Sequence, residues 1–126
     1  MGDMESEKLF EISLLADTFC SQHSFRLNLS KIKILYLIKK YEPAPASLLI
    51  NKLGLIKTNL SSACLELEKN GYIISKKGKE DKRSRSYRIT EEGKLILKEF
   101  LEDINKLLRE ENLGLDKALE ILNKKI

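Results

Sequence analysis

The sequence predicts a mainly α-helical fold with one small β-hairpin. Apolar residues recur at helical spacing along most of the 126 residues, whereas two short alternating apolar runs occur only within residues 72–90. With 42% hydrophobic and 33% charged residues, the composition is typical of a soluble, helix-rich protein that buries its own core. Residues 1–126 are therefore expected to form a single domain.

The first helix is expected over about residues 5–24. Its apolar side chains recur every three or four residues, which places on one face Leu9, Ile12, Leu15, Ala16, Phe19 and Cys20. A second helix is expected from Ser30, a residue type that caps helix starts, to Tyr41. The Glu-Pro-Ala-Pro segment at 42–45 ends it, because proline cannot donate the backbone hydrogen bond that a helix interior needs.

Two shorter helices joined by a tight turn are expected next. The first covers residues 46–53 and ends at Gly54, because glycine tolerates the positive φ of a helix C-cap. The second spans about 57–70 and is closed by Gly71. The side chains expected to face the core are Leu48, Leu49, Leu53, Leu60, Ala63, Cys64 and Leu67.

A cationic β-hairpin is expected over residues 72–90. Between Lys76 and Arg88, seven basic residues stand against two acidic ones, a net charge of +5, whereas the whole chain carries +4. Positive charge gathered in one loop directly after a helix-turn-helix pattern favours contact with the phosphates of a nucleic acid. The alternative, a charge run that serves only as a solvated surface, is less favoured in this position.

A long helix is expected to begin after Thr90, an N-cap residue followed by Glu91 and Glu92, since the helix dipole favours anions in the first turn. Its apolar stripe comprises Ile96, Leu97, Phe100, Leu101, Ile104, Leu107 and Leu108. The Asn-Leu-Gly-Leu segment at 112–115 breaks this helix, and Asp116 caps a last one, whose apolar residues are Ala118, Leu119, Ile121 and Leu122.

The terminal helices, about 5–24 and 91–125, predict a homodimer. Their stripes present more apolar surface than a monomer of this size can cover, and a second copy of the chain is the simplest cover. Residues of about 30–90 are expected to form a separate DNA-binding lobe. The expected dimer contacts are Leu9, Ile12, Leu97, Leu101, Leu119 and Leu122.

The order of these elements describes a winged helix-turn-helix with N- and C-terminal dimerisation helices. Residues 49–73 resemble, without a gap, the helix-turn-helix of MarR-type transcriptional regulators. The segment 81–83 (Asp-Lys-Arg), followed by Ile-Thr at 89–90 and by Gly93, is similar to the wing signature of that family, and the compact, lysine-rich chain is also similar to its SarA-like branch. The resemblance covers about residues 9–122. It implies a homodimeric repressor that binds a pseudo-palindromic operator in double-stranded DNA.

The resemblance assigns DNA-binding roles to the wing and the recognition helix. Arg83 would enter the minor groove with Asp81 orienting it, while Lys79, Lys82 and Arg85 would hold phosphates. The exposed first half of the recognition helix would meet the major groove through Lys57, Thr58, Asn59, Ser61 and Ser62. The family also implies a small-molecule effector, unidentified here, that enters the cleft between the dimer body and the winged lobes and lowers the affinity for DNA.

Two residues depart from the family pattern. Ile56 stands where the family usually has a capping Ser, Thr or Asp, and Ser62 stands where an arginine is frequent. Fewer cations in the major groove predict that binding depends more on phosphate contacts and groove shape than on base-specific readout.

The sequence offers little support for metal, redox or enzyme chemistry. Cys64 lies on a buried stripe, and Cys20 has only His23 one turn later to lower its pKa, so a redox role for Cys20 stays open but is not favoured. No Cys or His cluster has zinc spacing, and no cofactor is expected. One histidine and two cysteines do not assemble a nucleophile with its base, so an enzyme is not expected.

The second interpretation of this sequence is a winged-helix module for protein association, such as an adaptor or an antitoxin-like partner. Its acidic terminal segments would then form the working surface. No apolar run approaches the roughly 18 residues that span a bilayer, and the N-terminus is acidic where a signal peptide would be basic. No membrane association and a cytoplasmic location are therefore expected.

Overall fold

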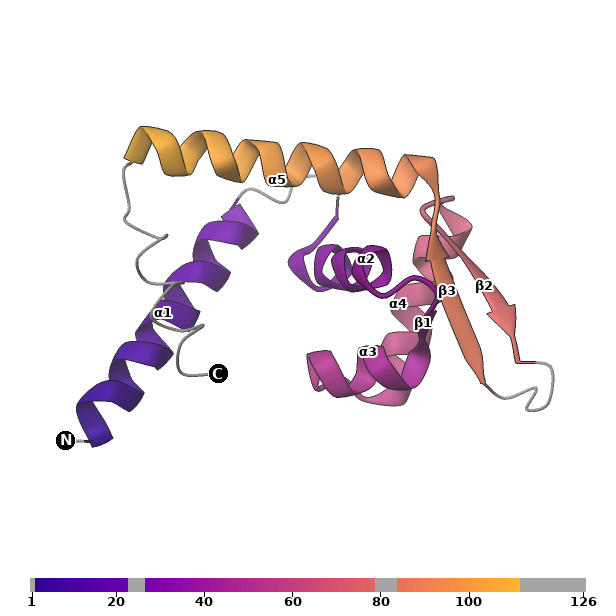
Figure 1. Cartoon of the computed structure of the whole chain (residues 1–126), viewed down its shortest axis with the longest axis horizontal. Coiled ribbons are helices and arrows are strands. Elements are labelled where there is room, and N and C mark those ends of the chain that lie inside the picture. The colour runs from indigo at the N-terminus through magenta and orange to yellow at the C-terminus, as the bar shows by residue number, and fades with distance from the viewer. Residues whose placement is uncertain (1, 23–26, 79–83, 112–126) are drawn as a thin grey trace.

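The computed structural model describes residues 2–22, 27–78 and 84–111. Its elements, in order, are α1 (Gly2–Gln22), α2 (Leu29–Lys40), β1 (Ala44–Pro45), α3 (Ala46–Leu53), α4 (Lys57–Lys69), β2 (Ile73–Lys77), β3 (Arg85–Ile89) and α5 (Glu91–Glu111). Helices α2, α3 and α4 and the sheet form a winged lobe, α5 crosses one side of it, and α1 extends away from it (Figure 1). The expected mainly α-helical fold with a hairpin wing is confirmed.

The capping chemistry of the helices agrees with the sequence except at α2. Asn28, rather than Ser30, caps this helix, because the Asn28 side chain accepts a hydrogen bond from the backbone N–H of Lys31 at 3.0 Å. Ser30 lies inside the first turn of α2. The expected cap was therefore wrong by two positions, since asparagine and serine both cap helix starts. Gly54 ends α3 with a φ of 64°, in the left-handed region, as expected.

The start of α5 is fixed on the beginning of the wing. Thr90 Oγ1 accepts a hydrogen bond from the N–H of Gly93 at 3.1 Å and donates one to the carbonyl oxygen of Gly71 at 2.7 Å. A Cβ at Gly93 would lie 2.3 Å from the carbonyl oxygen of Tyr72, so only glycine fits without a shift of the backbone. The expected cap at Thr90 is confirmed, and it sets the direction in which α5 leaves the lobe.

The sheet contains a third strand that the sequence did not predict. Its order is β1-β3-β2, and both pairs are antiparallel. In the expected β2–β3 hairpin, Ser75 lies opposite Tyr87, and Ala44 of β1 lies opposite Tyr87 on its other side. Strand β1 has two residues, too few for an alternating pattern, and its proline fits because β1 is an edge strand.

The core lies between the helices of the winged lobe, the sheet and the first half of α5. Its fully buried side chains include Ile34, Leu35, Ile38, Leu49, Leu60, Leu67, Ile73 and Leu97. The side chains expected to face the core on the third and fourth helices are confirmed: Leu49, Leu60, Cys64 and Leu67 are buried, and Leu48, Leu53 and Ala63 pack partly buried against the core. Leu97 is a correction, because its exposed fraction is 0% and it packs within the chain, so it is not available as a dimer contact. Leu119 and Leu122 lie outside the described residues.

Among the described residues, helix α1 contacts the lobe at its C-terminal end. None of its described side chains is part of the buried core, although Cys20 packs against it. Lys33 Nζ of α2 lies 3.4 Å from Asp17 Oδ1 of α1, an exposed ion pair. In the part of the chain that the structure describes, no helix is long and apolar enough to cross a membrane.

Candidate nucleic-acid interface

The first half of α4 presents a polar face to solvent. The five residues assigned to the major groove all lie on α4 and are exposed: Lys57, Thr58, Asn59, Ser61 and Ser62. The opposite face is buried through Leu60, Cys64 and Leu67, so helical periodicity alone turns the polar residues outward. Ile56 precedes α4 without a side-chain cap and is 67% exposed, consistent with its departure from the family pattern.

The wing strands carry exposed cations up to the loop that joins them. Lys77 lies opposite Arg85, and the N–H of Gly78 donates a 3.0 Å hydrogen bond to the carbonyl oxygen of Ser84 as the last contact before the loop. Four exposed side chains of the strands are basic: Lys76, Lys77, Arg85 and Arg88. Of these four, Arg85 is one of the five residues that the resemblance assigned to the wing. The remaining assigned residues lie in 79–83, outside the described residues: Lys79, Asp81, Lys82 and Arg83.

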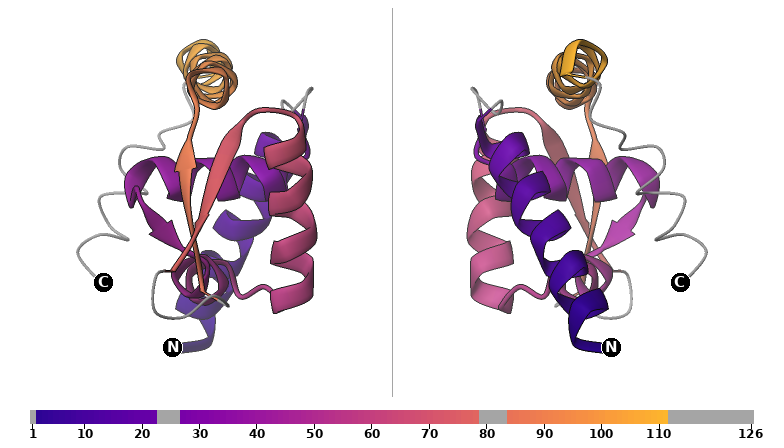
Figure 2. Two further views of the ribbon diagram at one scale, coloured as in Figure 1. Left: turned by 90° about the vertical axis from the view of Figure 1, so that its right-hand side faces the viewer. Right: turned by 90° about the vertical axis from the view of Figure 1, so that its left-hand side faces the viewer.

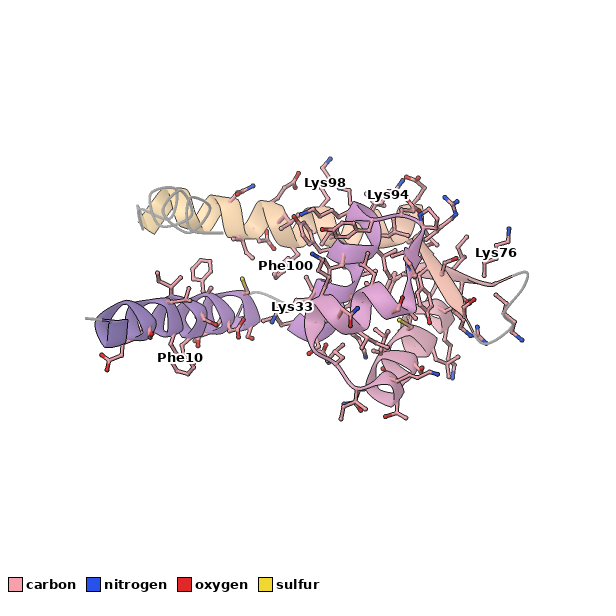
Figure 3. The ribbon with its side chains drawn as sticks, turned by 60° about the horizontal axis from the view of Figure 1, so that its bottom comes forward. Phe10, Lys33, Lys76, Lys94, Lys98 and Phe100 are labelled. Carbon is pink, nitrogen blue, oxygen red and sulfur yellow. The ribbon has the colours of Figure 1, made fainter. Side chains whose placement is uncertain are left out.

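The polar end of α4 and the loop end of the wing open on the same side of the lobe. Figures 1 and 2 show the N-terminal end of α4 and the loop end of the β2–β3 hairpin at the bottom of the lobe, with α5 at the top. Phe100 points from α5 toward the lobe, whereas Lys94 and Lys98 lie on the other side of α5 (Figure 3). Lys94 and Lys98 thus point away from the lobe.

Cys64 contributes to the packing between α4 and the sheet. Its side chain is 2% exposed and is hydrogen-bonded to the hydroxyl of Tyr87. Burial raises the pKa of Cys64 to about 11, although the bond to Tyr87 acts in the opposite direction. Burial, together with the neighbouring thiol, raises the pKa of Tyr87 to about 12. Both groups are neutral at physiological pH, and the expectation that Cys64 is a core residue is confirmed.

Cys20 lies at the junction of α1 and α2, beside a cation that sequence spacing did not indicate. Partial burial raises the pKa of the Cys20 thiol, and Asp17 adds to this effect, whereas Lys33 opposes it. The balance disfavours a thiolate, the form that reacts with oxidants. His23 lies outside the described residues.

Two further cations meet on one aromatic ring and were not singled out in the sequence. The ammonium nitrogens of Lys40 and Lys52 lie 5.5 Å and 5.7 Å from the ring centroid of Tyr41. The two lysines belong to α2 and α3, and only the folded chain brings them together. Among the described residues, no three His, Cys, Asp or Glu side chains are grouped so that they could hold a metal ion.

Comparison with known proteins agrees with this geometry. The chain belongs to the winged helix DNA-binding domain family, whose model matches residues 30–108. No curated protein sequence matches the chain.

The chain has the fold of MarR-type transcription regulators, as the resemblance implied. The transcriptional regulator BldR from Sulfolobus solfataricus is 21% identical, with a TM-score of 0.77 over 96% of this chain and 91% of that chain. A mutant MarR from E. coli is 19% identical, with a TM-score of 0.80 over 95% and 93%. FabT from Streptococcus pneumoniae, solved in complex with DNA, is 20% identical, with a TM-score of 0.67 over 98% and 96%. The family is thus one of DNA-binding domains, and the fold is the one that MarR-type regulators share.

Proposed function

We propose that this chain is a transcriptional regulator that binds double-stranded DNA, with α4 in the major groove and the basic wing at the adjacent minor groove. The observation that carries the proposal is that the polar half of α4 and the loop end of the hairpin lie on the same side of the lobe. A duplex on this side meets both elements at once. The winged-helix docking geometry uses these same two elements.

The proposed regulator acts as a homodimer through its terminal helices. Leu9 and Leu14 of α1 are 53% and 51% exposed, and Leu101 of α5 is 37% exposed. Ile12 is half-buried, and the proposal extends the interface to Leu119 and Leu122. A second copy would cover these side chains, and its two-fold symmetry would match a pseudo-palindromic operator.

Repression is the proposed outcome of binding, because the resemblance to MarR-type regulators favours a protein that occupies its operator and blocks transcription. A small molecule between the dimer body and the winged lobes would then release the DNA. These two statements rest on the resemblance, whereas the DNA interface also has the support of exposed cations and helix orientation.

A matched pair of charge deletions tests the DNA interface. Lys82→Ala removes a cation from the wing loop, and Lys98→Ala removes one from α5, on the side away from Phe100 (Figure 3). Fluorescence titrations of a duplex at several salt concentrations should show weaker binding for Lys82→Ala and a salt slope reduced by roughly one, because about one fewer counterion is released. Lys98→Ala should bind like the native chain. Equal behaviour of the two variants would contradict the wing assignment and favour the protein-adaptor interpretation.

A further inference from the structure

Two hydrogen bonds connect the recognition helix to the wing, and a third continues from the first strand of the wing to the second. Glu68 Oε1, on the last turns of α4, accepts from the backbone N–H of Ser75 at 3.2 Å and from the Ser75 hydroxyl at 2.8 Å. The same hydroxyl accepts from Arg85 Nη1 at 3.3 Å. One carboxylate is thus linked to both strands of the hairpin, directly to β2 and through Ser75 to β3.

The backbone bond to Glu68 lies at the free edge of the sheet. Strand β2 is an edge strand in the order β1-β3-β2, so the N–H groups that point away from β3 have no strand partner. The backbone N–H of an edge strand that has no strand partner is normally hydrogen-bonded to water. At Ser75 the carboxylate of α4 takes the place of a neighbouring strand, and this contact fixes the edge of the wing to the recognition helix.

The side-chain bonds run in one direction from a cation to an anion. Arg85 donates to the Ser75 hydroxyl, and that hydroxyl donates to Glu68, so each bond polarises the next. Arg85 is exposed at the start of β3, among the residues assigned to phosphates. Its guanidinium is therefore oriented by a residue of the recognition helix, with the bridging serine between them.

We propose that Glu68 is a positioning residue for DNA binding: through Ser75, it holds the wing and Arg85 at a fixed place relative to α4. This inference rests on the proposed function, since a fixed spacing matters when α4 and the wing enter neighbouring grooves of one duplex. Electrostatics and positioning make opposite predictions for the loss of Glu68. Removal of an anion from a DNA-binding lobe should tighten binding, whereas loss of the positioning contacts should weaken it.

Glu66 provides the control, because it lies on the same helix and carries the same charge. Its carboxylate pairs with Lys31 of α2, on another side of α4 from the Ser75 contact of Glu68. Glu68→Ala should weaken binding to a duplex selected from a random library by about tenfold, the loss expected when hydrogen bonds to a charged group are removed. Binding to an unselected duplex should change less than about threefold, since phosphate contacts dominate there. Glu66→Ala should bind both duplexes as tightly as the native chain or more tightly.

Glu68→Gln separates the hydrogen bonds from the charge. The amide oxygen of glutamine can still accept from Ser75, so this variant should recover most of the affinity that Glu68→Ala loses. Should Glu68→Ala fail to fold, Ser75→Ala provides a second variant: it removes the hydroxyl between Glu68 and Arg85 and keeps the backbone bond to Glu68. It should lower the selected-to-unselected affinity ratio as well. Glu68→Ala that binds both duplexes like Glu66→Ala would overturn the proposal.

Amide hydrogen exchange keeps this inference distinct from the proposed function. In Glu68→Ala, the amides of β2 and β3 should exchange at least about tenfold faster than in Glu66→Ala, because the free edge loses its support. A native chain that binds no duplex would defeat the proposed function, and the exchange data would still decide whether Glu68 holds the wing. Faster exchange at Ser75 alone, with the rest of the hairpin unchanged, would overturn that role.

Discussion

The winged lobe buries its apolar side chains, whereas α1 leaves large apolar side chains exposed. In the lobe, Leu35, Leu49 and Leu67 are 0% exposed, so one chain completes this core. In α1, Leu9, Phe10 and Leu14 are 53%, 63% and 51% exposed, and Phe10 projects on the side away from α5 (Figure 3). The core of the lobe is thus complete within one chain, whereas the described residues leave these α1 side chains exposed, and the proposed dimer would cover them.

Helix α5 belongs to both regions. Its first half packs on the lobe through Leu97 and Phe100, which are 0% and 9% exposed, while Leu101 on the next turn is 37% exposed. The far end of α5 lies over α1 in Figure 1. Thr90 and Gly93 fix the start of α5 on the wing, so α5 connects the DNA-binding lobe to the proposed dimer body.

The largest expected effect comes from a charge in the lobe core. Leu97→Asp places a carboxylate without a partner at a fully buried position, which should cost on the order of 4 kcal/mol and unfold most of the chain at room temperature. Circular dichroism against temperature would measure the loss. A variant that unfolds cooperatively near the native midpoint would show that Leu97 is not part of a closed core.

A charge on α1 should break association instead of folding. Leu9→Asp is expected to weaken dimerisation by about 2 kcal/mol, because the dimer would bury the carboxylate, while thermal unfolding of the lobe changes little. Leu119→Asp and Leu122→Asp should act in the same direction. Light scattering over a range of concentrations measures the mass of the particles in solution. Leu95→Asp is the control: Leu95 is an exposed leucine of α5 outside the proposed interface, so this variant should stay dimeric. A native chain that is monomeric at micromolar concentration would contradict the proposed interface.

Alkaline pH should destabilise the lobe through Cys64 and Tyr87. Their pKa values are raised to about 11 and about 12 in the folded chain, from ordinary values of 9.0 and 10.0. Below about pH 9 both states hold these protons; between pH 9 and 12 the unfolded chain releases them first, so stability falls. Urea unfolding at pH 8 and pH 11 should differ by on the order of 2 kcal/mol from these groups.

Substitution of a buried and of an exposed tyrosine identifies which group causes the loss of stability at alkaline pH. Tyr87→Phe should reduce the difference between the two pH values, because one of the retained protons is gone. Tyr36→Phe, which removes a hydroxyl from a side chain that is 45% exposed, should leave it as in the native chain. The same reduction in both variants would place the pH dependence elsewhere.

The smallest effect is expected at Cys20, on the boundary between the two regions. Burial and Asp17 raise its pKa, so the thiol is a poor nucleophile toward peroxide. Cys20→Ser should leave the affinity for DNA unchanged with and without peroxide. Release of DNA by peroxide from the native chain, but not from Cys20→Ser, would establish the redox role that the pKa disfavours.

Local signals predicted most of the lobe. The turn between α3 and α4 follows from Gly54, and the buried stripe of α4 follows from the spacing of Leu60, Cys64 and Leu67, because both depend on residues close in sequence. Strand β1 was missed because two residues show no period. Asn28 and Ser30 have similar capping chemistry, and only the folded backbone distinguishes them.

Long-range packing accounts for the rest. Leu97 and Leu101 belong to one apolar stripe, and periodicity does not say that the lobe covers the first and leaves the second partly exposed. The hydrogen bonds from Ser75 to Glu68 and from Arg85 to Ser75 join α4, β2 and β3. No spacing rule links a glutamate on a helix to a particular edge amide. The exposed residues of the candidate site were therefore predictable from the sequence. The hydrogen bonds from Glu68 through Ser75 to Arg85 were not.

The most direct test of the central claim is selection of duplexes from a random library with the purified native chain, followed by the stoichiometry of the selected complex. A homodimer with α4 in the major groove should enrich two inverted half-sites, centred about 10–10.5 base pairs or a multiple of this spacing apart. Two chains should bind each duplex. Enrichment of one isolated half-site with one chain bound, or no enrichment at all, would contradict a homodimeric DNA-binding regulator.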